Sequence, residues 1–83
     1  MVRERGKRLE AMRANPGGDW RVSDVEAVCR DHGLRCSPPR GGSHFKVAHP
    51  ALPEMLSIPF ARPIKQVYIR RLVAMIDAVE SLP

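Results

Sequence analysis

Residues 41–50, Gly-Gly-Ser-His-Phe-Lys-Val-Ala-His-Pro, constrain the fold of this chain more than any other stretch. The paired glycines favour a turn, because glycine reaches backbone angles that other residues avoid. After the turn, side chains alternate as in a half-buried strand, with Phe45 and Val47 on one face and His44 and Lys46 on the other. The stretch therefore predicts a strand that carries an imidazole and an ammonium group together on its polar face.

The rest of the chain predicts helices on either side of three short strands. Ser23 and Glu26 have the spacing of a capping box at the start of a helix, and Gly33 has the position of a left-handed helix end. A second amphipathic stretch carries Ile69, Leu72, Val73, Ile76 and Val79 on one side. The expected order is a helix over residues 20–33, strands over residues 34–37, 43–48 and 54–60, and a helix over residues 66–81.

These elements predict an α+β fold, with a three-stranded antiparallel sheet and two helices covering one face. In the third strand, Leu56, Ile58 and Phe60 fall on one side, where they can meet Phe45 and Val47 across an antiparallel pair. That apolar face must be covered, and helices are what the chain has left to cover it. The order α-β-β-β-α is also that of the double-stranded RNA-binding domain (dsRBD).

Residues 1–18 are expected to form a basic extension and linker in front of a domain over residues 19–83. Residues 2–14 contain five lysines and arginines against two glutamates, with Leu9 and Met12 as the main apolar side chains. They predict a short helix that docks weakly or binds a partner. A phosphate-binding arm and a solvated leader remain alternatives.

Charge and composition narrow the class of partner. The formal net charge of +5 favours a polyanion such as nucleic acid. Only 5% of residues are aromatic, which argues against proteins that stack successive bases of a single strand on aromatic rings. There is no apolar run long enough for a membrane span and no apolar signal segment at the N-terminus, so we expect a cytoplasmic protein.

Cys29, His32 and Cys36 form a Cys-x-x-His-x-x-x-Cys pattern. A zinc site needs a fourth ligand and a more regular spacing, so small buried side chains are the favoured interpretation of the cysteines, with neither metal nor cofactor. We expect His32 to have a structural role at the end of its helix.

The motif Gly42-Ser43-His44, four residues, His49-Pro50 resembles the signature of the HicA family, small toxins of prokaryotic toxin–antitoxin pairs that cut messenger RNA. The resemblance covers about residues 20–79. It implies a dsRBD-like fold, endoribonuclease (mRNA interferase) activity and a HicB-like antitoxin as protein partner. By this resemblance His44 is the catalytic histidine. The chain departs from the family in its longer amino terminus and in a proline-rich connection over residues 58–66.

The residues themselves suggest how such a site would work. A neutral imidazole at His44 could take the proton of the RNA 2′-hydroxyl, while cations stabilise charge on the phosphate, and no metal is required. His49 is an odd number of residues from His44, so an unbroken strand turns it to the opposite face. The residues expected to bind RNA or its phosphates are Arg40, Gly42, Ser43, Lys46, Arg62 and Lys65.

Two other functions remain open at this point. The first is a non-catalytic RNA-binding module on the same fold, and the second is a protein-interaction domain whose basic surface meets an acidic partner. Histidines on strands are commonly ordinary surface residues, and only the enzyme depends on the proton chemistry of His44.

Overall fold

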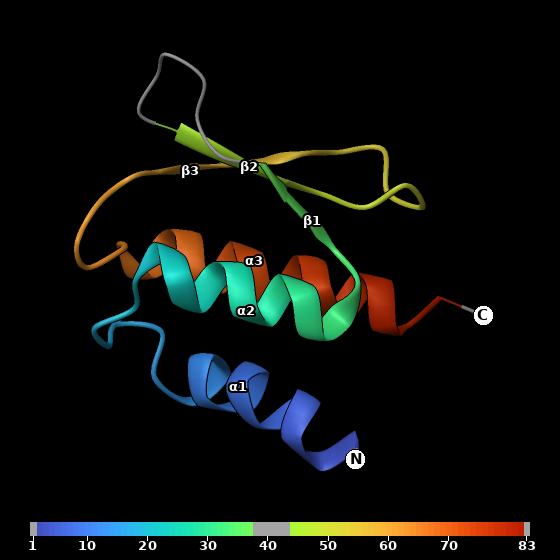
Figure 1. The fold of residues 1–83 in the computed structure, drawn as a ribbon, viewed down its shortest axis with the longest axis horizontal. Coiled ribbons are helices and arrows are strands. Elements are labelled where there is room, and N and C mark those ends of the chain that lie inside the picture. Colours follow the sequence, from blue (N-terminus) through green and yellow to red (C-terminus); the bar gives the residue numbers. More distant parts are fainter. Residues whose placement is uncertain (1, 38–43, 83) are drawn as a thin grey trace.

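The computed structural model describes residues 2–37 and 44–82, with side chains from residue 6 onward. The three strands form an antiparallel sheet in the order β1-β2-β3. Helices α2 and α3 lie side by side under one face of the sheet, and α1 lies beyond them (Figure 1). The expected α+β class with a three-stranded antiparallel sheet is confirmed. The elements are α1 (Val2–Ala14), α2 (Val22–His32), β1 (Arg35–Ser37), β2 (His44–Ala48), β3 (Leu56–Pro59) and α3 (Gln66–Glu80).

Strand β2 has the two faces that its alternation predicts. Phe45 and Val47 are buried, whereas His44 and Lys46 are exposed. Phe45 lies opposite Ile58 of β3, and Val47 lies opposite both Cys36 of β1 and Leu56 of β3. The apolar face of the sheet therefore meets α2 and α3, and the polar face of β2 stays open.

Helix α2 begins earlier than its predicted capping box. Arg21, in an extended conformation, is the cap residue, and its backbone N–H donates to a carboxylate oxygen of Asp24 at 2.9 Å. The observed capping box therefore joins Arg21 and Asp24. The predicted box joined Ser23 and Glu26, so its kind was right and its residues were wrong. The end of the helix is as predicted, with Gly33 in the left-handed region at φ 76°.

Strand β3 is shorter than the predicted strand over residues 54–60, and its last apolar residue is not in the core. The ladder to β2 runs from Leu56 to Pro59. Pro59 has no N–H to continue a ladder, and the strand ends there. Ile58 is buried as expected, but Phe60 is 54% exposed, so its predicted place on the buried face was wrong.

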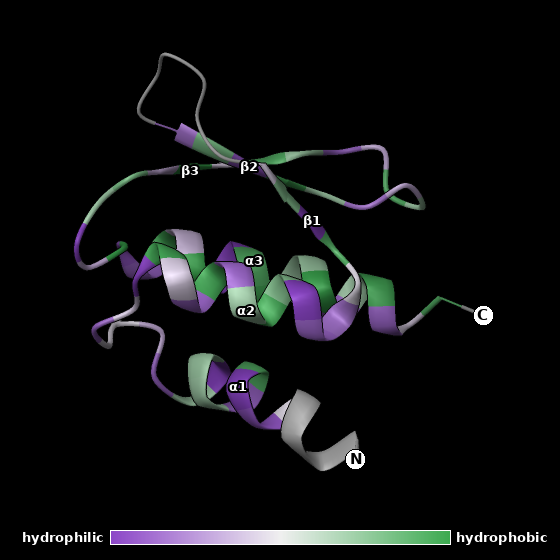
Figure 2. Ribbon diagram, viewed as in Figure 1, coloured by the Kyte–Doolittle hydropathy of each residue, from purple (hydrophilic) through white to green (hydrophobic). Residues whose placement is uncertain are grey.

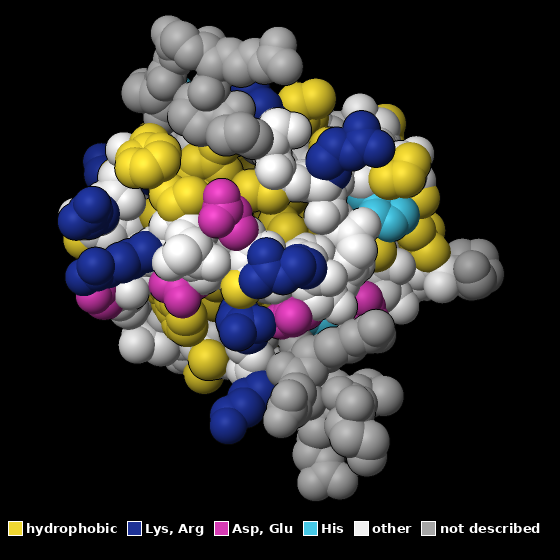
Figure 3. All heavy atoms as spheres, in the orientation of Figure 1, with side chains coloured by type: hydrophobic (Ala, Val, Ile, Leu, Met, Phe, Trp, Pro, Cys, Tyr) yellow, Lys and Arg dark blue, Asp and Glu magenta, His cyan; other side chains and the backbone are white. Residues whose placement is uncertain are grey.

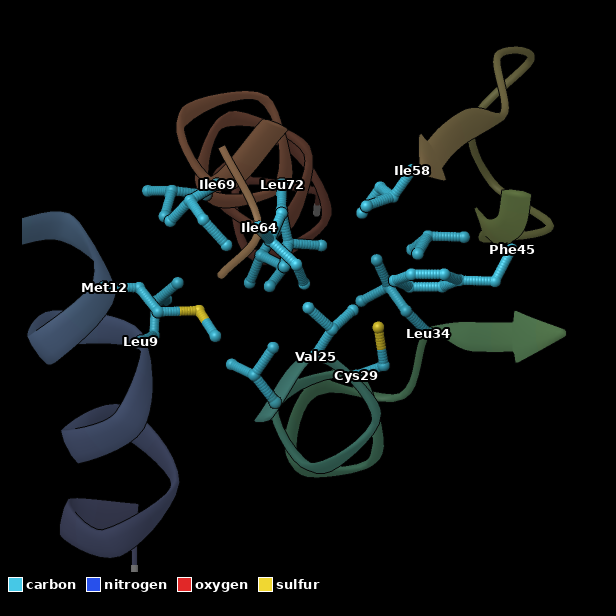
Figure 4. Close-up of a cluster of buried hydrophobic side chains, with 14 residues drawn as sticks. Leu9, Met12, Val25, Cys29, Leu34, Phe45, Ile58, Ile64, Ile69 and Leu72 are labelled. Carbon is cyan, nitrogen blue, oxygen red and sulfur yellow. The ribbon is translucent and has the colours of Figure 1, made fainter. Parts of the chain in front are cut away.

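One hydrophobic core joins all three layers. Ile69, Leu72, Val73 and Ile76 of α3 are buried, as the stripe predicts, and Val79 is partly buried. Figure 4 shows side chains from the sheet, α2 and α3 converging there, with Leu9 and Met12 entering from α1. Figure 2 shows green, apolar stretches of ribbon in the sheet and in both α2 and α3. Burying such side chains is the main stabilising contribution to a small fold.

Helix α1 is part of this core, so the solvated leader was wrong. Leu9 and Met12 are 5% and 0% exposed. Arg13 donates two hydrogen bonds to the carboxylate of Asp77 on α3, at 2.6 and 2.8 Å, and Arg8 pairs with Asp31 on α2. Within residues 2–37 and 44–82, none of the helices combines the length and the apolar character that crossing a bilayer requires.

Candidate functional site

His44 stands at the first position of β2, on the face of the sheet that the helices leave uncovered. Its backbone pairs with Pro59 of β3, and its side chain is exposed. Lys46 follows two residues later on the same face, opposite Ser57. The structure therefore brings together the imidazole and the ammonium group that the sequence predicted side by side. The predicted site residues Arg40, Gly42 and Ser43 lie outside the described residues.

Arg62 and Lys65 occupy the connection between β3 and α3, which a buried side chain holds in place. Ile64 is 2% exposed at the centre of the core, and its backbone N–H donates to the carbonyl of Trp20 at 2.9 Å. This hydrogen bond draws the connection against the amino end of α2. As a result the connection that contains Arg62 and Lys65 runs from the end of the sheet to the layer of the helices (Figure 1).

A shallow hollow of about 250 Å³ lies where this connection meets the amino end of α2. Two arginines, Arg21 and Arg62, and the aromatic residue Phe60 border it. The lining residues are Arg21, Val22, Ser23, Phe60, Ala61 and Arg62. Lys65 lines a smaller neighbouring hollow of about 120 Å³ together with Pro59, Ala61 and Tyr68.

The positive charges at this end of the molecule are only partly neutralised. Arg21 has one ion pair, to Asp19 at 3.2 Å, and more than half of its side chain is exposed. Lys46, Arg62 and Lys65 make no ion pair with any residue in the described part of the chain. Figure 3 shows lysines and arginines over the left-hand end, where α2 and α3 begin. Unneutralised cations around a shallow surface suit the phosphates of a nucleic acid.

The second histidine of the motif, His49, lies just beyond β2 and accepts hydrogen bonds within the following turn. Its Nδ1 accepts a hydrogen bond from the backbone N–H of Ala51 at 3.0 Å, and its carbonyl accepts one from Leu52 at 3.0 Å. Both contacts shape the turn between β2 and β3. Because β2 ends at Ala48, His49 lies outside the strand, and the prediction from its odd spacing to His44 along an unbroken strand does not apply to it.

Cys29, His32 and Cys36 do not converge on one point. The ring of His32 is nearly buried, and its Nδ1 lies 3.1 Å from a carboxylate oxygen of Glu80, in keeping with a structural role. A hydrogen bond between the two thiols, together with burial, raises the pKa of Cys29 well above its usual range, and the same bond lowers the pKa of Cys36. Across residues 2–37 and 44–82, no group of three or more His, Cys, Asp and Glu side chains could hold a metal ion.

Three residues of this region carried no sequence prediction of a role there. Arg21 and Phe60 border the hollow, and Ile64 fixes the connection that contains Arg62. Ile64 follows Pro59 and Pro63 in an irregular connection, where no periodicity marks a buried position. Arg21 directly precedes α2, a position suited to a phosphate contact, but the predicted helix over residues 20–33 placed it inside the helix. Neither the models of protein families, nor the curated proteins, nor the solved structures give a match to this chain.

Proposed function

We propose that this protein is an RNA-cleaving toxin of the HicA kind, a metal-independent endoribonuclease that uses His44 as its general base. The observation that carries the proposal is the place of His44 at the start of β2, exposed on the open face with Lys46 beside it. The Gly-Ser-His motif supports the same residue. The order of α2, β1–β3 and α3, with both helices on one face, is compatible with the dsRBD-like fold that the resemblance implies.

RNA supplies its own nucleophile in this chemistry. His44 takes the proton of a 2′-hydroxyl, the oxygen attacks the adjacent phosphorus, and the bond from phosphorus to the 5′-oxygen of the next nucleotide breaks, which leaves a 2′,3′-cyclic phosphate and a 5′-hydroxyl that takes its proton from solvent. Lys46 stabilises the negative charge that gathers on the phosphate oxygens. Arg62 and Lys65 hold the flanking phosphates at the end of the sheet, and Arg40, Gly42 and Ser43 are proposed contacts of the same RNA.

The test is a comparison of the two histidines of the motif. His44→Ala should reduce cleavage of RNA by roughly a hundred- to ten-thousandfold, the usual contribution of a positioned acid–base group. His49→Ala removes only the turn contact to Ala51, so it should cost about 0.5–1.5 kcal/mol of stability and leave cleavage within a few-fold. A melting curve for each variant confirms folding. A folded His44→Ala protein that still degrades RNA would show that the catalyst lies elsewhere, and the non-catalytic RNA-binding module would then be the better function.

The antitoxin part of the proposal has a separate test. A HicB-like, acidic partner would cover the open face of the sheet and its positive charges, since opposite potentials favour such contacts. Co-expression with the neighbouring reading frame, followed by affinity purification, should recover a stable complex in which His44 and Lys46 are protected from chemical modification. A complex that leaves both side chains reactive would contradict this mode of inhibition.

A further inference from the structure

Phe60 is too exposed for a core residue, and it lines a hollow on the surface where a ligand can contact it. The alternation of β3 assigns it to the buried face, yet 54% of it is exposed, and it lines the same hollow as Arg21 and Arg62. Departures from an otherwise consistent pattern tend to occur at functional positions. The hollow is lined by one aromatic residue and two arginines, a combination that can bind the base and the phosphate of a nucleotide.

Other exposed apolar side chains lack these surroundings. Met55 and Val67 are 61% and 44% exposed, but neither borders this hollow. Met55 belongs to a larger, mainly apolar hollow between the β2–β3 turn and α3. Single exposed apolar residues are common and need no special explanation. Phe60 differs from them because it lines the same hollow as Arg21 and Arg62.

The position of the hollow links it to His44. Pro59 is the cross-strand partner of His44, and Phe60 is the next residue along the chain. An RNA strand whose phosphate lies at His44 on the open face therefore reaches the hollow by passing around the end of β3. The backbones of His44 and Phe60 are separated by about one interstrand spacing plus one residue, so we place the two positions within reach of adjacent nucleotides.

We propose that this hollow is a subsite for one unpaired nucleotide next to the cut phosphate. The base stacks on the ring of Phe60, and Arg62 and Arg21 contact the phosphate of the same nucleotide. This inference rests on the proposed function for the position of the cut, and it adds the class of substrate: single-stranded rather than duplex RNA. A base within a duplex has both faces covered by its neighbours, so it offers none to the ring. A single ring also agrees with the low aromatic content, which argues only against stacking many bases.

The experiment measures binding to a probe that cannot be cut. The probe is an unstructured oligoribonucleotide with 2′-O-methyl groups throughout, because these block the nucleophile, and affinity is read from fluorescence anisotropy. Phe60→Leu should bind roughly 5- to 150-fold more weakly, the range for loss of one base–aromatic stack. Phe60→Trp keeps a stacking face and should bind within about twofold of the wild type. Val67→Ala, an exposed apolar residue outside the hollow, is the matched control and should also stay within about twofold.

The outcomes separate this inference from the proposed function. If Phe60→Leu binds like Val67→Ala, or if it weakens binding to a duplex of the same sequence equally, the subsite is wrong even where wild-type protein cleaves RNA. Absence of binding by the wild type would also overturn it. If instead binding depends on Phe60 while His44→Ala cuts RNA like the wild type, the subsite stands and the assignment of His44 fails. Melting curves show that each variant is folded.

Discussion

The basic residues of this protein fall into two regions that the fold treats in opposite ways. On α1, Arg8 and Arg13 are paired with carboxylates of α2 and α3. In the connection between β3 and α3, Arg62 and Lys65 face no carboxylate of the described chain. The amino terminus was the more basic of the two in sequence, and it was a candidate phosphate-binding arm. Its described arginines instead hold the helix in place.

The difference shows that the role of a basic residue depends on whether a carboxylate of the protein pairs with it. A guanidinium group with two hydrogen bonds to Asp77 has little capacity left for phosphate, whereas an unpaired ammonium group keeps its counterions ready for release. Arg21 is intermediate, because it contacts Asp19 and also borders the hollow beside Phe60. We therefore expect α1 to control stability and the end of the sheet near His44 to control RNA binding.

Removing the core contact of α1 should have the largest effect on stability. Met12 is completely buried, so Met12→Ala should lower the free energy of unfolding by about 2–5 kcal/mol, through lost burial and the cavity left behind. Met55 is 61% exposed, and Met55→Ala should change it by about 0.5 kcal/mol or less. Urea denaturation of both variants measures the difference. Equal losses would mean that α1 does not belong to the cooperative core.

Removing two cations from one basic region or from the other should have different effects on RNA binding. Arg62→Ala with Lys65→Ala should reduce the slope of log affinity against log salt by about 1.4, since each phosphate contact on a single strand contributes about 0.7. Arg8→Ala with Arg13→Ala should leave that slope unchanged and lower the melting temperature instead. Titrations of the 2′-O-methyl probe at several salt concentrations give both slopes. A reduced slope for the α1 pair would restore the phosphate-binding arm.

Much of the fold followed from local patterns in the sequence. The alternation around Phe45 and Val47 fixed which face of β2 is buried, and Gly33 marked the end of α2 because few other residues tolerate its positive φ. These features act within a few residues along the chain, and sequence displays them directly. The exposure of His44 and Lys46 follows from the same alternation.

The parts that sequence did not predict depend on contacts between distant segments. The burial of Met12 requires α2 and α3 as partners, and the hydrogen bond from Ile64 to Trp20 joins residues 44 positions apart. Phe60 was assigned to the core by alternation alone, although Pro59 directly before it is a local signal that the strand ends. The hollow beside it arises from two segments far apart in the sequence, the amino end of α2 and the connection between β3 and α3. The candidate site was therefore half visible in sequence, as His44 and Lys46, and half created by tertiary packing.

The smallest expected effect is the acid sensitivity of the α1 contact. Hydrogen bonds from Arg13 are the main cause that lowers the pKa of Asp77, and the charge of His32 adds to it in the same direction. A carboxylate with a lowered pKa in the folded state stabilises the protein above its unfolded pKa of about 3.9, and that contribution is lost as pH falls through the folded value. Because Asp77 is well exposed to solvent, Asp77→Asn should lower the melting temperature at pH 7 by only a few degrees. The difference in melting temperature between wild type and variant should shrink steadily below pH 4, where both lack the charge.

The control is Glu54→Gln, since Glu54 is an exposed carboxylate without an ion pair in the described chain, and it should shift the melting temperature little at either pH. A gap between wild type and Asp77→Asn that persists at pH 2 would show that the side chain acts through packing, and not through its charge on Arg13.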